Sequence, residues 1–364
     1  MDIAVIGGGH GAYAAAAALT EQGHKVRLWR RDAAAFAPVL ERKAVTVKDS
    51  KGTRDVALHL ATTDLAQAVR GAQLLVIPLP ATTHVDLAPQ LAPQLQDGQV
   101  VFFTPGTFGS YIFAKAKEAC GNRANVTFAE TGTLPYLARK HGPRLVVVSG
   151  YATRLPTGVF PLRNAAQAFP ILEAGYPAVE RITDALDGAL MNAGPIIHPP
   201  LIMMNAGPLE HFDTWDIHNE GTQPAIRRVT DALDLERVAI REALGYGAPH
   251  FPLADHYDDS REEWMYGNAA HERLTDSGDW REHIDLVHHR YMLEDVEQGL
   301  AFLVSCADYA GVPAPIATGL LAMGSAITGR NLRKCGRTLE NLGLATLKRD
   351  ALKMLLQQGV GAKA

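Results

Sequence analysis

The sequence predicts an α/β N-terminal domain followed by a mostly α-helical C-terminal domain. The chain opens with a short apolar run that leads directly into a cluster of glycines. Strand-like and helix-like segments then alternate as far as about residue 185, and beyond that point the strand-like runs disappear. We therefore expect two domains, residues 1–185 and residues 186–364.

The opening run, IAVIGGGHGAYAAA at residues 3–16, has the pattern of a buried parallel strand that turns tightly into a helix. Its glycines fit G-x-G-x-x-(G/A), with Gly7 at the turn, Gly9 at the closest backbone approach and Ala12 at the third position. The free N–H groups at the start of an alanine-rich helix would attract a pyrophosphate. Because a second strand follows at residues 25–29, the run indicates a Rossmann dinucleotide-binding domain rather than an ordinary glycine-rich turn. The predicted cofactor-binding residues of this loop are Gly7, Gly9, His10, Gly11 and Ala12.

The tip of the second strand bears on which dinucleotide binds. It reads Trp29-Arg30-Arg31-Asp32, whereas an NAD site usually carries an acidic residue at the tip itself. Two guanidiniums suit a 2′-phosphate, so Arg30 and Arg31 predict NADP as the cofactor, with NAD as the alternative. The other interpretation is a solvated basic turn in which Asp32 is a simple counter-ion.

The remaining segments of the first domain continue the alternation. We expect a hairpin inserted in the sheet at 44–47 and 56–60, strands at 74–78, 99–103, 125–129 and 144–148, and helices at 64–69, 85–95 and from 111. A doubly wound sheet binds its ligand at the carboxyl ends of the strands. Pro80, just after the strand at 74–78, is therefore a further candidate cofactor-binding residue.

Composition excludes several classes of partner. The 364 residues are 47% hydrophobic and 20% charged with a net charge of −4, which argues against binding to nucleic acid or to an anionic membrane surface. No apolar run reaches the roughly 18 residues of a membrane span. Three widely spaced cysteines predict a reducing compartment and no metal site. Because the N-terminus enters a strand at once, we expect no signal peptide, and a cytoplasmic enzyme is the prediction.

The second domain offers two clusters that could carry chemistry. His198 lies among apolar and proline residues, where it is either a satisfied core histidine or an acid–base group. The run HHRYMLEDV at 288–296 opens a helix and places cations and carboxylates within two turns. A carboxylate bonded to His198 would fix its tautomer, and the spacing alone does not choose between Glu294 and Asp295. Both carboxylates could instead be surface groups that complement the helix dipole.

Several motifs together resemble the octopine/nopaline (opine) dehydrogenase family. They occur in the family's order and span nearly the whole chain: ETGTLPY at 130–136, Asn192 to Pro199 around His198, NEGTQP at 219–224, LDLER at 233–237, RYxxEDVxxGL at 290–300 and GRTLENLGL at 336–344. The resemblance implies a Rossmann domain with a helical partner domain and an NAD(P)H-dependent reductive condensation of an amino acid with a 2-oxo acid such as pyruvate. It also implies that His198 and Asp295 act together and that Arg290 holds a substrate carboxylate.

The resemblance adds expectations about the substrates and the assembly. Thr133 and Trp264 are candidate substrate-binding residues, although a stretch such as Trp264–Asn268 is more often plain packing. The expected partners are a small amino acid and a 2-oxo acid, and a homodimer is one candidate assembly. We expect the substrate cleft between the two domains.

The sequence departs from the family at His10, where the family usually carries asparagine, so His10 either contacts the cofactor or packs within the loop. One alternative function is a related NADP-dependent reductase of the 2-dehydropantoate reductase or glycerol-3-phosphate dehydrogenase type, which joins no amine. The 2-dehydropantoate reductases favour a lysine proton donor. Another is a non-catalytic nucleotide sensor, which would not need His198, Arg290 and Asp295 together.

Overall fold

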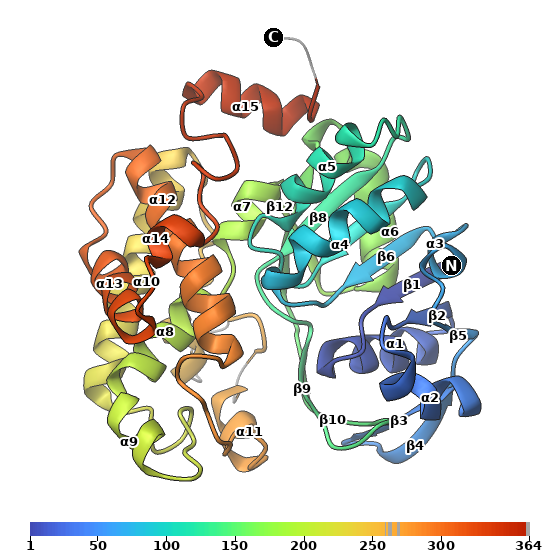
Figure 1. Ribbon diagram of the computed structural model, residues 1–364, viewed down its shortest axis with the longest axis horizontal. Coiled ribbons are helices and arrows are strands. Elements are labelled where there is room, and N and C mark those ends of the chain that lie inside the picture. The colour runs from blue at the N-terminus through green and yellow to red at the C-terminus, as the bar shows by residue number, and fades with distance from the viewer. Residues whose placement is uncertain (259, 261–263, 268–269, 362–364) are drawn as a thin grey trace. The chain divides into compact units, whose positions relative to one another are not determined.

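The computed structural model describes residues 1–258, 260, 264–267 and 270–361. The chain divides into two compact units, shown as ribbons in Figure 1. The first contains Met1–Leu79, Thr83–Ala189 and the residues from Lys353 onward, and the second contains Pro80–Thr82 and Leu190–Leu352.

The division between the units differs from the predicted boundary at residue 185 in two respects. Helix α7 (Ala185–Leu190) packs on the sheet of the first unit through Gly188, where a Cβ would lie 2.6 Å from the carbonyl oxygen of Glu130. Because of this close approach, the first unit extends to Ala189. The end of the chain, predicted for the second domain, groups with the first unit because Gly359 packs against Pro161.

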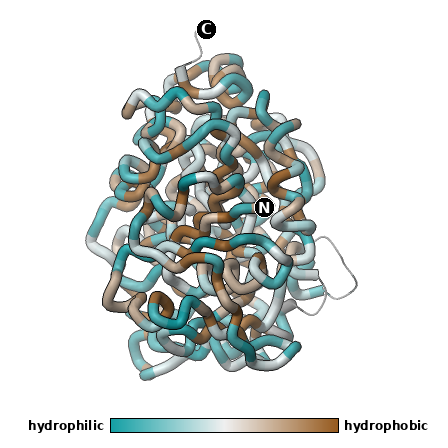
Figure 2. Tube along the Cα trace, turned by 90° about the vertical axis from the view of Figure 1, so that its right-hand side faces the viewer, coloured by the Kyte–Doolittle hydropathy of each residue, from teal (hydrophilic) through white to brown (hydrophobic). Residues whose placement is uncertain are grey.

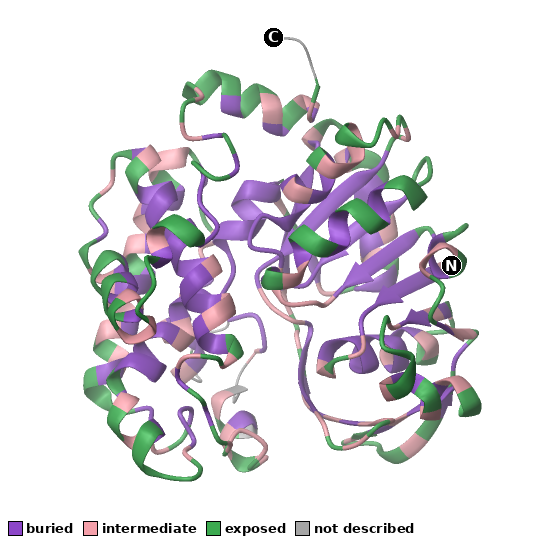
Figure 3. Ribbon diagram, in the orientation of Figure 1, coloured by how far each residue is buried: buried purple, intermediate pink, exposed green. Residues whose placement is uncertain are grey.

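The first unit is built on an eight-stranded sheet of order β12-β11-β8-β7-β6-β1-β2-β5. All neighbouring strands are parallel except β8 and β11. The apolar runs of β6 and β7 are completely buried, as a parallel sheet covered on both faces requires. Strand β6 is purple in Figure 3, and Figure 2 colours the hydrophobic residues of the chain brown. The strands are β1 (Asp2–Ile6), β2 (Lys25–Trp29), β5 (Leu60–Thr62), β6 (Leu74–Ile77), β7 (Val100–Phe103), β8 (Thr127–Thr131), β11 (Leu155–Phe160) and β12 (Val179–Asp184).

Helices and short 3₁₀ turns connect these strands. They are α1 (His10–Glu21), α2 (Ala33–Arg42), α3 (Leu65–Val69), η1 (Ala81–Thr83), α4 (His84–Leu91), η2 (Ala92–Gln94), α5 (Gly109–Ala119), η3 (Leu162–Asn164) and α6 (Ala165–Gly175). Helix α15 (Arg349–Gln358) lies near the end of the chain, and the division between the units falls within it.

The predicted hairpin does not belong to the wound sheet, and this expectation is wrong. Strands β3 (Ala44–Asp49) and β4 (Gly52–Ala57) form a separate four-stranded sheet of order β4-β3-β10-β9 with β9 (Tyr136–Lys140) and β10 (Leu145–Tyr151). The predicted strand at 144–148 lies in this second sheet as well. In β10, buried residues alternate with partly exposed ones, the pattern of a sheet that packs on one face only. A parallel strand at the centre of the wound sheet would be apolar on both faces.

The second unit is helical, so the fold class predicted from the sequence is confirmed. Its helices are α8 (Gly194–Met204), α9 (Ala206–His211), α10 (Pro224–Leu244), η4 (Leu253–Tyr257), α11 (Ala270–Asp276), η5 (Tyr291–Leu300), α12 (Ala301–Ala310), α13 (Pro315–Thr328) and α14 (Leu332–Cys335). Helix α8 packs closely on η5, since a Cβ on Gly299 would clash with Pro195. Within the described ranges, no helix has the length and apolar character needed to cross a bilayer.

Candidate active site

The glycine loop has the backbone geometry that a dinucleotide requires. Gly7 has φ +143°, a conformation that favours glycine, and its N–H donates to the carbonyl of Trp29 at 2.9 Å. Gly9 precedes α1 and no side chain caps this helix, which leaves its first N–H groups directed at the loop. Gly11 allows a second close approach, because a Cβ there would lie 2.6 Å from Cδ1 of Leu134. The Cβ of Ala12 in turn lies against Gly7. The loop therefore fits the phosphates of NAD or NADP.

The basic tip of β2 lies next to this loop. The side chain of Arg30 crosses Gly8, where a Cβ would clash with it, and donates to the carbonyl of Ala35 at 3.1 Å. Arg31 is exposed. The carboxylate of Asp32 accepts the N–H of Ala35 at 3.0 Å and caps α2, which accounts for an acidic residue beyond the usual ribose-binding position.

The segment after β6 is held by the helical unit at two points. The N–H of Ala81 donates to Oε1 of Glu294 at 3.1 Å, and Arg337 donates to the carbonyl of Ala81 at 2.8 Å. Pro80 was predicted to bind cofactor as part of the first domain, but it belongs to the short piece that groups with the second unit. Arg337 and Glu294 are the physical reason for that grouping.

The helical unit brings His198 and Asp295 into direct contact. Nδ1 of His198 lies 2.7 Å from Oδ2 of Asp295, and both side chains are largely buried. Gly194 at the start of α8 makes the contact possible, since a Cβ at that position would clash with Oδ1 of Asp295. Between the two carboxylates that the spacing left open, Asp295 meets the histidine and Glu294 turns to Ala81.

The helix that carries Asp295 begins as a π-helix. Residues Tyr291–Leu300 form η5, and Arg290 stands directly before it. A π-helix bonds each N–H to the carbonyl five residues earlier, so residues five apart lie about one turn apart. Arg290 and Asp295, which are separated by five positions, therefore lie on the same side of the segment. Arg290 is an exposed residue, and the central carbon of its guanidinium lies 5.4 Å from the ring centre of Tyr291.

Burial shapes the acid–base properties of the carboxylates. It raises the pKa of Asp295 to about 7, and nearby Arg290 opposes the shift. Burial also raises the pKa of Glu294 to about 7, with a further contribution from the charge of Asp295. A carboxyl group that titrates near neutral pH beside an imidazole suits proton transfer.

Two aromatic neighbours of His198 were missed in the sequence. The ring of Tyr291 stacks on it at 4.0 Å with an interplanar angle of 22°, and His218 meets it edge-on at 5.7 Å. Tyr291 could have been suspected, because it adjoins Arg290 in the sequence. The sequence gives no such signal for His218, because it approaches His198 only when the segment before NEGTQP is folded beside α8.

The remaining predicted residues are spread over both units. Thr133 lies in the first unit, in the connection between β8 and β9 next to Leu134. Trp264 lies in the second, is 3% exposed and packs 5.5 Å from the ring of His256. The Nδ1 atom of His10 accepts the N–H of Lys140 at 2.6 Å, so this nitrogen serves packing and is not available to a cofactor.

Parts of the family-like motifs serve structure. The carboxylate of Glu130 in ETGTLPY accepts the N–H groups of Phe108 and Ser110 at 2.8 and 2.7 Å, at the start of α5. Glu236 in LDLER accepts those of Ile316 and Ala317 at the start of α13. These motifs therefore cap helices in the described structure.

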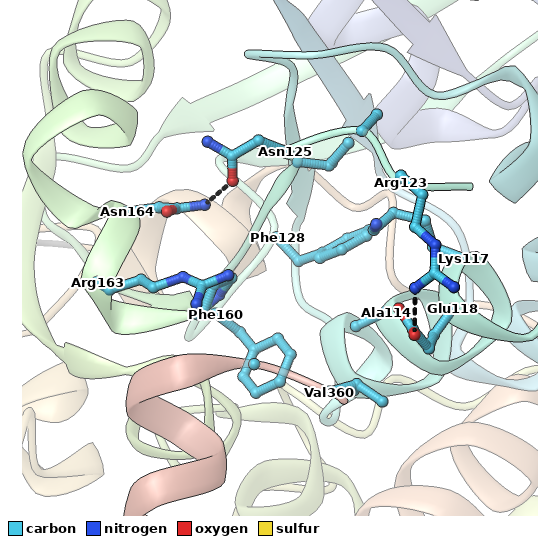
Figure 4. A pocket seen from close by; sticks show the side chains of 14 residues that line it. Ala114, Lys117, Glu118, Arg123, Asn125, Phe128, Phe160, Arg163, Asn164 and Val360 are labelled. Atoms are coloured by element: carbon cyan, nitrogen blue, oxygen red, sulfur yellow. Dashed lines mark hydrogen bonds and ion pairs between the residues drawn. The ribbon is translucent and has the colours of Figure 1, made fainter. Parts of the chain in front are cut away.

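A cavity of about 490 Å³ opens in the first unit near Lys117, Phe128 and Arg163 (Figure 4). Its wall includes Asn125, which precedes β8, and Phe160, which pairs with Phe128 at the end of the antiparallel strand β11. The cavity thus lies at the amino-terminal end of β8, whereas the glycine loop follows the carboxyl end of the parallel strand β1. It is separate from the cofactor site.

Comparison with known proteins agrees with this arrangement. Residues 181–328 match the family NAD/NADP octopine/nopaline dehydrogenase, alpha-helical domain, and residues 2–108 match the NAD-dependent glycerol-3-phosphate dehydrogenase N-terminus. An opine dehydrogenase of Arthrobacter sp. (strain 1C) is 27% identical over 362 residues, which cover 97% of this chain and 98% of that protein.

Two solved structures share the fold over the whole chain. Octopine dehydrogenase in complex with NADH and agmatine has a TM-score of 0.72 at 17% identity, covering 100% of this chain and 99% of that chain. Octopine dehydrogenase with NADH and pyruvate has a TM-score of 0.71 at 18% identity, with the same coverage of 100% and 99%.

The match of the helical unit to the octopine/nopaline dehydrogenase domain and the similarity to opine dehydrogenases identify an NAD(P)-dependent oxidoreductase that acts on CH–NH bonds. Within that class, the helical unit matches the octopine/nopaline dehydrogenase family, and the chain is similar over nearly its whole length to an opine dehydrogenase.

The position of Glu294 leads to a testable difference between the two carboxylates. Glu294→Gln keeps an acceptor for the N–H of Ala81 but removes a negative charge near the pair, and a nearby negative charge stabilises protonated forms. We expect the acid limb of the pH–rate profile to move to lower pH by up to about one unit, with the maximal rate changed only a few-fold. The measurement is kcat/KM against pH for the parent and the variant. A loss of activity as severe as that of Asp295→Asn would contradict the assignment.

Proposed function

We propose that this protein catalyses the NAD(P)H-dependent reductive condensation of an amino acid with a 2-oxo acid such as pyruvate. The amino group adds to the keto carbon, water leaves to give an imine, and hydride reduces the imine carbon to a secondary amine. The observation that carries the proposal is the 2.7 Å contact between His198 and Asp295 in the helical unit that matches the family.

The proton transfers of this reaction suit the His198–Asp295 pair. Imine formation needs a base for the attacking amine and an acid for the departing water. Because the carboxylate of Asp295 is hydrogen-bonded to Nδ1 of His198, Nε2 is the nitrogen that exchanges protons with the substrates. Stacking on Tyr291 holds the imidazole plane while the proton moves. Gly7, Gly9 and Gly11 shape the loop that would hold the pyrophosphate of a dinucleotide, whose reduced nicotinamide would supply the hydride.

Arg290 is the proposed anchor for a substrate carboxylate. Arg290 is an exposed residue on the same side of η5 as Asp295, and its charge acts on that carboxylate. A planar fork of N–H donors binds a carboxylate through two parallel hydrogen bonds, which fixes the keto carbon relative to the acid–base pair.

Amine-dependent cofactor oxidation tests the proposed reaction directly. We expect oxidation of NADPH in the presence of pyruvate only when a suitable amino acid is added, with a secondary-amine dicarboxylate as product by mass spectrometry. Oxidation with the 2-oxo acid alone, unchanged by any amino acid, would instead show a simple ketone reductase. Cofactor binding without turnover would favour a nucleotide sensor.

Arg30 and Arg31 support NADP as the preferred cofactor. Replacing both with alanine removes the charge-assisted hydrogen bonds to a 2′-phosphate. We therefore expect KM for NADPH to rise about tenfold or more while KM for NADH changes little. Steady-state kinetics with both cofactors make the comparison, and Arg228→Ala on the exposed face of α10 is a matched control. Equal effects on NADPH and NADH would show that the two arginines only line the surface.

We also propose that the enzyme works in the cytoplasm, which three free cysteines support: Cys120, Cys306 and Cys335.

A further inference from the structure

Two cations contact one buried tyrosine beside the glycine loop, one at its hydroxyl group and the other at its ring. Nη1 of Arg30 lies 3.5 Å from the hydroxyl of Tyr13, and Nζ of Lys140 lies 4.3 Å from the centre of the Tyr13 ring. Tyr13 is in the first turn of α1 and is completely buried, so it is a rigid platform for both. Arg30 comes from the end of β2, whereas Lys140 ends β9 in the other sheet.

No carboxylate of the described chain neutralises either cation. Arg30 donates to the hydroxyl of Tyr13 and to the carbonyl of Ala35, and its Nε–H and Nη2 groups form no hydrogen bond among the described residues. Lys140 has no ion pair among the described residues either, and its ammonium lies over the ring of Tyr13. Burial together with the charge of Arg30 lowers the pKa of Lys140, so the two charges lie close enough to repel. Like charges that are held together without a counter-ion favour binding of an anion.

The position of Lys140 is linked to the glycine loop by His10. The N–H of Lys140 donates to Nδ1 of His10 at 2.6 Å, and His10 is the first residue of α1. This bond joins residues 130 positions apart in the sequence and sets the end of β9 against the start of the helix. The cation pair is therefore held at the loop that receives the dinucleotide.

We propose that Lys140 and Arg30 form a clamp for the 2′-phosphate of NADPH, and that His10 is the positioning residue that places Lys140 in it. The proposal rests on the dinucleotide site of the proposed function and specifies its cofactor. A phosphate monoester carries nearly two negative charges at neutral pH and offers three acceptor oxygens, which match one ammonium and one guanidinium. The pyrophosphate is met by the N–H groups of α1 and is common to NADH and NADPH, so it cannot account for a preference between them.

Binding of four nucleotides to Lys140→Gln tests the clamp without reference to the catalysed reaction. Calorimetry would measure Kd for NADPH, NADH, 2′,5′-ADP and 5′-ADP. We expect Kd to rise about tenfold for NADPH and 2′,5′-ADP and less than about twofold for NADH and 5′-ADP. Lys140→Arg keeps the charge and should restore most of the NADPH affinity. Lys48→Gln, an exposed lysine in the same sheet as Lys140, is the matched control and should change none of the four values.

Three other results of the binding experiment would overturn the proposal, each in a distinct way. Equal losses for all four nucleotides would place Lys140 at the pyrophosphate, and unchanged binding of all four would remove it from the cofactor site. A lower melting temperature with weakened binding of every ligand would mean a structural role only. If the protein binds NADPH as expected but no amino acid supports turnover, the proposed reaction fails and the clamp stands.

His10 is tested as a positioning residue by a pair of variants. His10→Ala removes the acceptor for the N–H of Lys140 and should weaken NADPH binding several-fold, while kcat at saturating NADPH stays close to that of the parent. His10→Asn offers a side-chain oxygen close to the position of Nδ1 and should restore the affinity. A failure of His10→Asn to rescue, or a fall in kcat at saturation, would contradict the role assigned to His10.

Discussion

His198→Ala lowers kcat by about two to four orders of magnitude, the usual contribution of a positioned general acid–base group, while Kd for the cofactor stays within a few-fold of the parent value. Asp295→Asn produces a loss of similar size, because the amide cannot hold the imidazole with the same tautomer and charge. Both losses are expected in kcat measured with saturating pyruvate and amino acid. The matched control is His211→Ala, an exposed histidine at the end of α9, which should leave kcat unchanged.

The double variant separates a working pair from two independent residues. Groups that act as a unit are strongly non-additive, so His198→Ala combined with Asp295→Asn should be little slower than the slower single variant. The contact of 2.7 Å between Nδ1 and Oδ2 is the reason for this expectation. Losses that multiply would contradict the pair, as would a silent Asp295→Asn beside a damaging Glu294→Gln.

Arg290→Lys raises KM for a carboxylate substrate about ten- to a hundredfold even though the positive charge is kept. An ammonium is a point charge and cannot form the two parallel hydrogen bonds of a guanidinium, so both affinity and orientation suffer. Separate saturation curves for pyruvate and for the amino acid would show which carboxylate Arg290 holds. Cofactor affinity should be little changed.

Two comparisons make this result specific to Arg290. Arg228→Lys, on the exposed face of α10, tests whether an arginine-to-lysine change elsewhere in the unit alters kinetics, and no effect is expected. Normal saturation of Arg290→Lys by both substrates would remove Arg290 from the binding site.

Local patterns in the sequence were sufficient for the dinucleotide fold. Turn chemistry and hydrophobic period are properties of neighbouring residues: Gly7 needs its positive φ in any context, and the apolar runs of β1, β6 and β7 can only be buried on both faces. Helix α10 likewise begins and ends at local signals, because Pro224 starts it and Gly245 ends it with φ +96°. The family resemblance came from several separate motifs in a shared order.

The hairpin shows where local patterns were not sufficient. A strand lies at the predicted segment 44–47, but the predicted segment 56–60 spans the end of β4 and the start of β5, and no local signal says which sheet a strand joins. That choice depends on β9 and β10, which follow about ninety residues later and offer β3 a partner. Pairing between distant segments is a property of the packed chain.

By itself, the sequence determined a glycine loop for a dinucleotide, a helical second unit and a short set of residues able to do acid–base chemistry. Only the tertiary structure decided that Asp295 rather than Glu294 meets His198, because adjacent residues of a helix point in different directions and α8 packs on η5 at Gly194. It also decided that His10 bonds to Lys140, since these residues meet only when the second sheet folds against α1. Side-chain type follows from the sequence, but the partner of a buried polar group depends on which backbones can approach closely enough to pair.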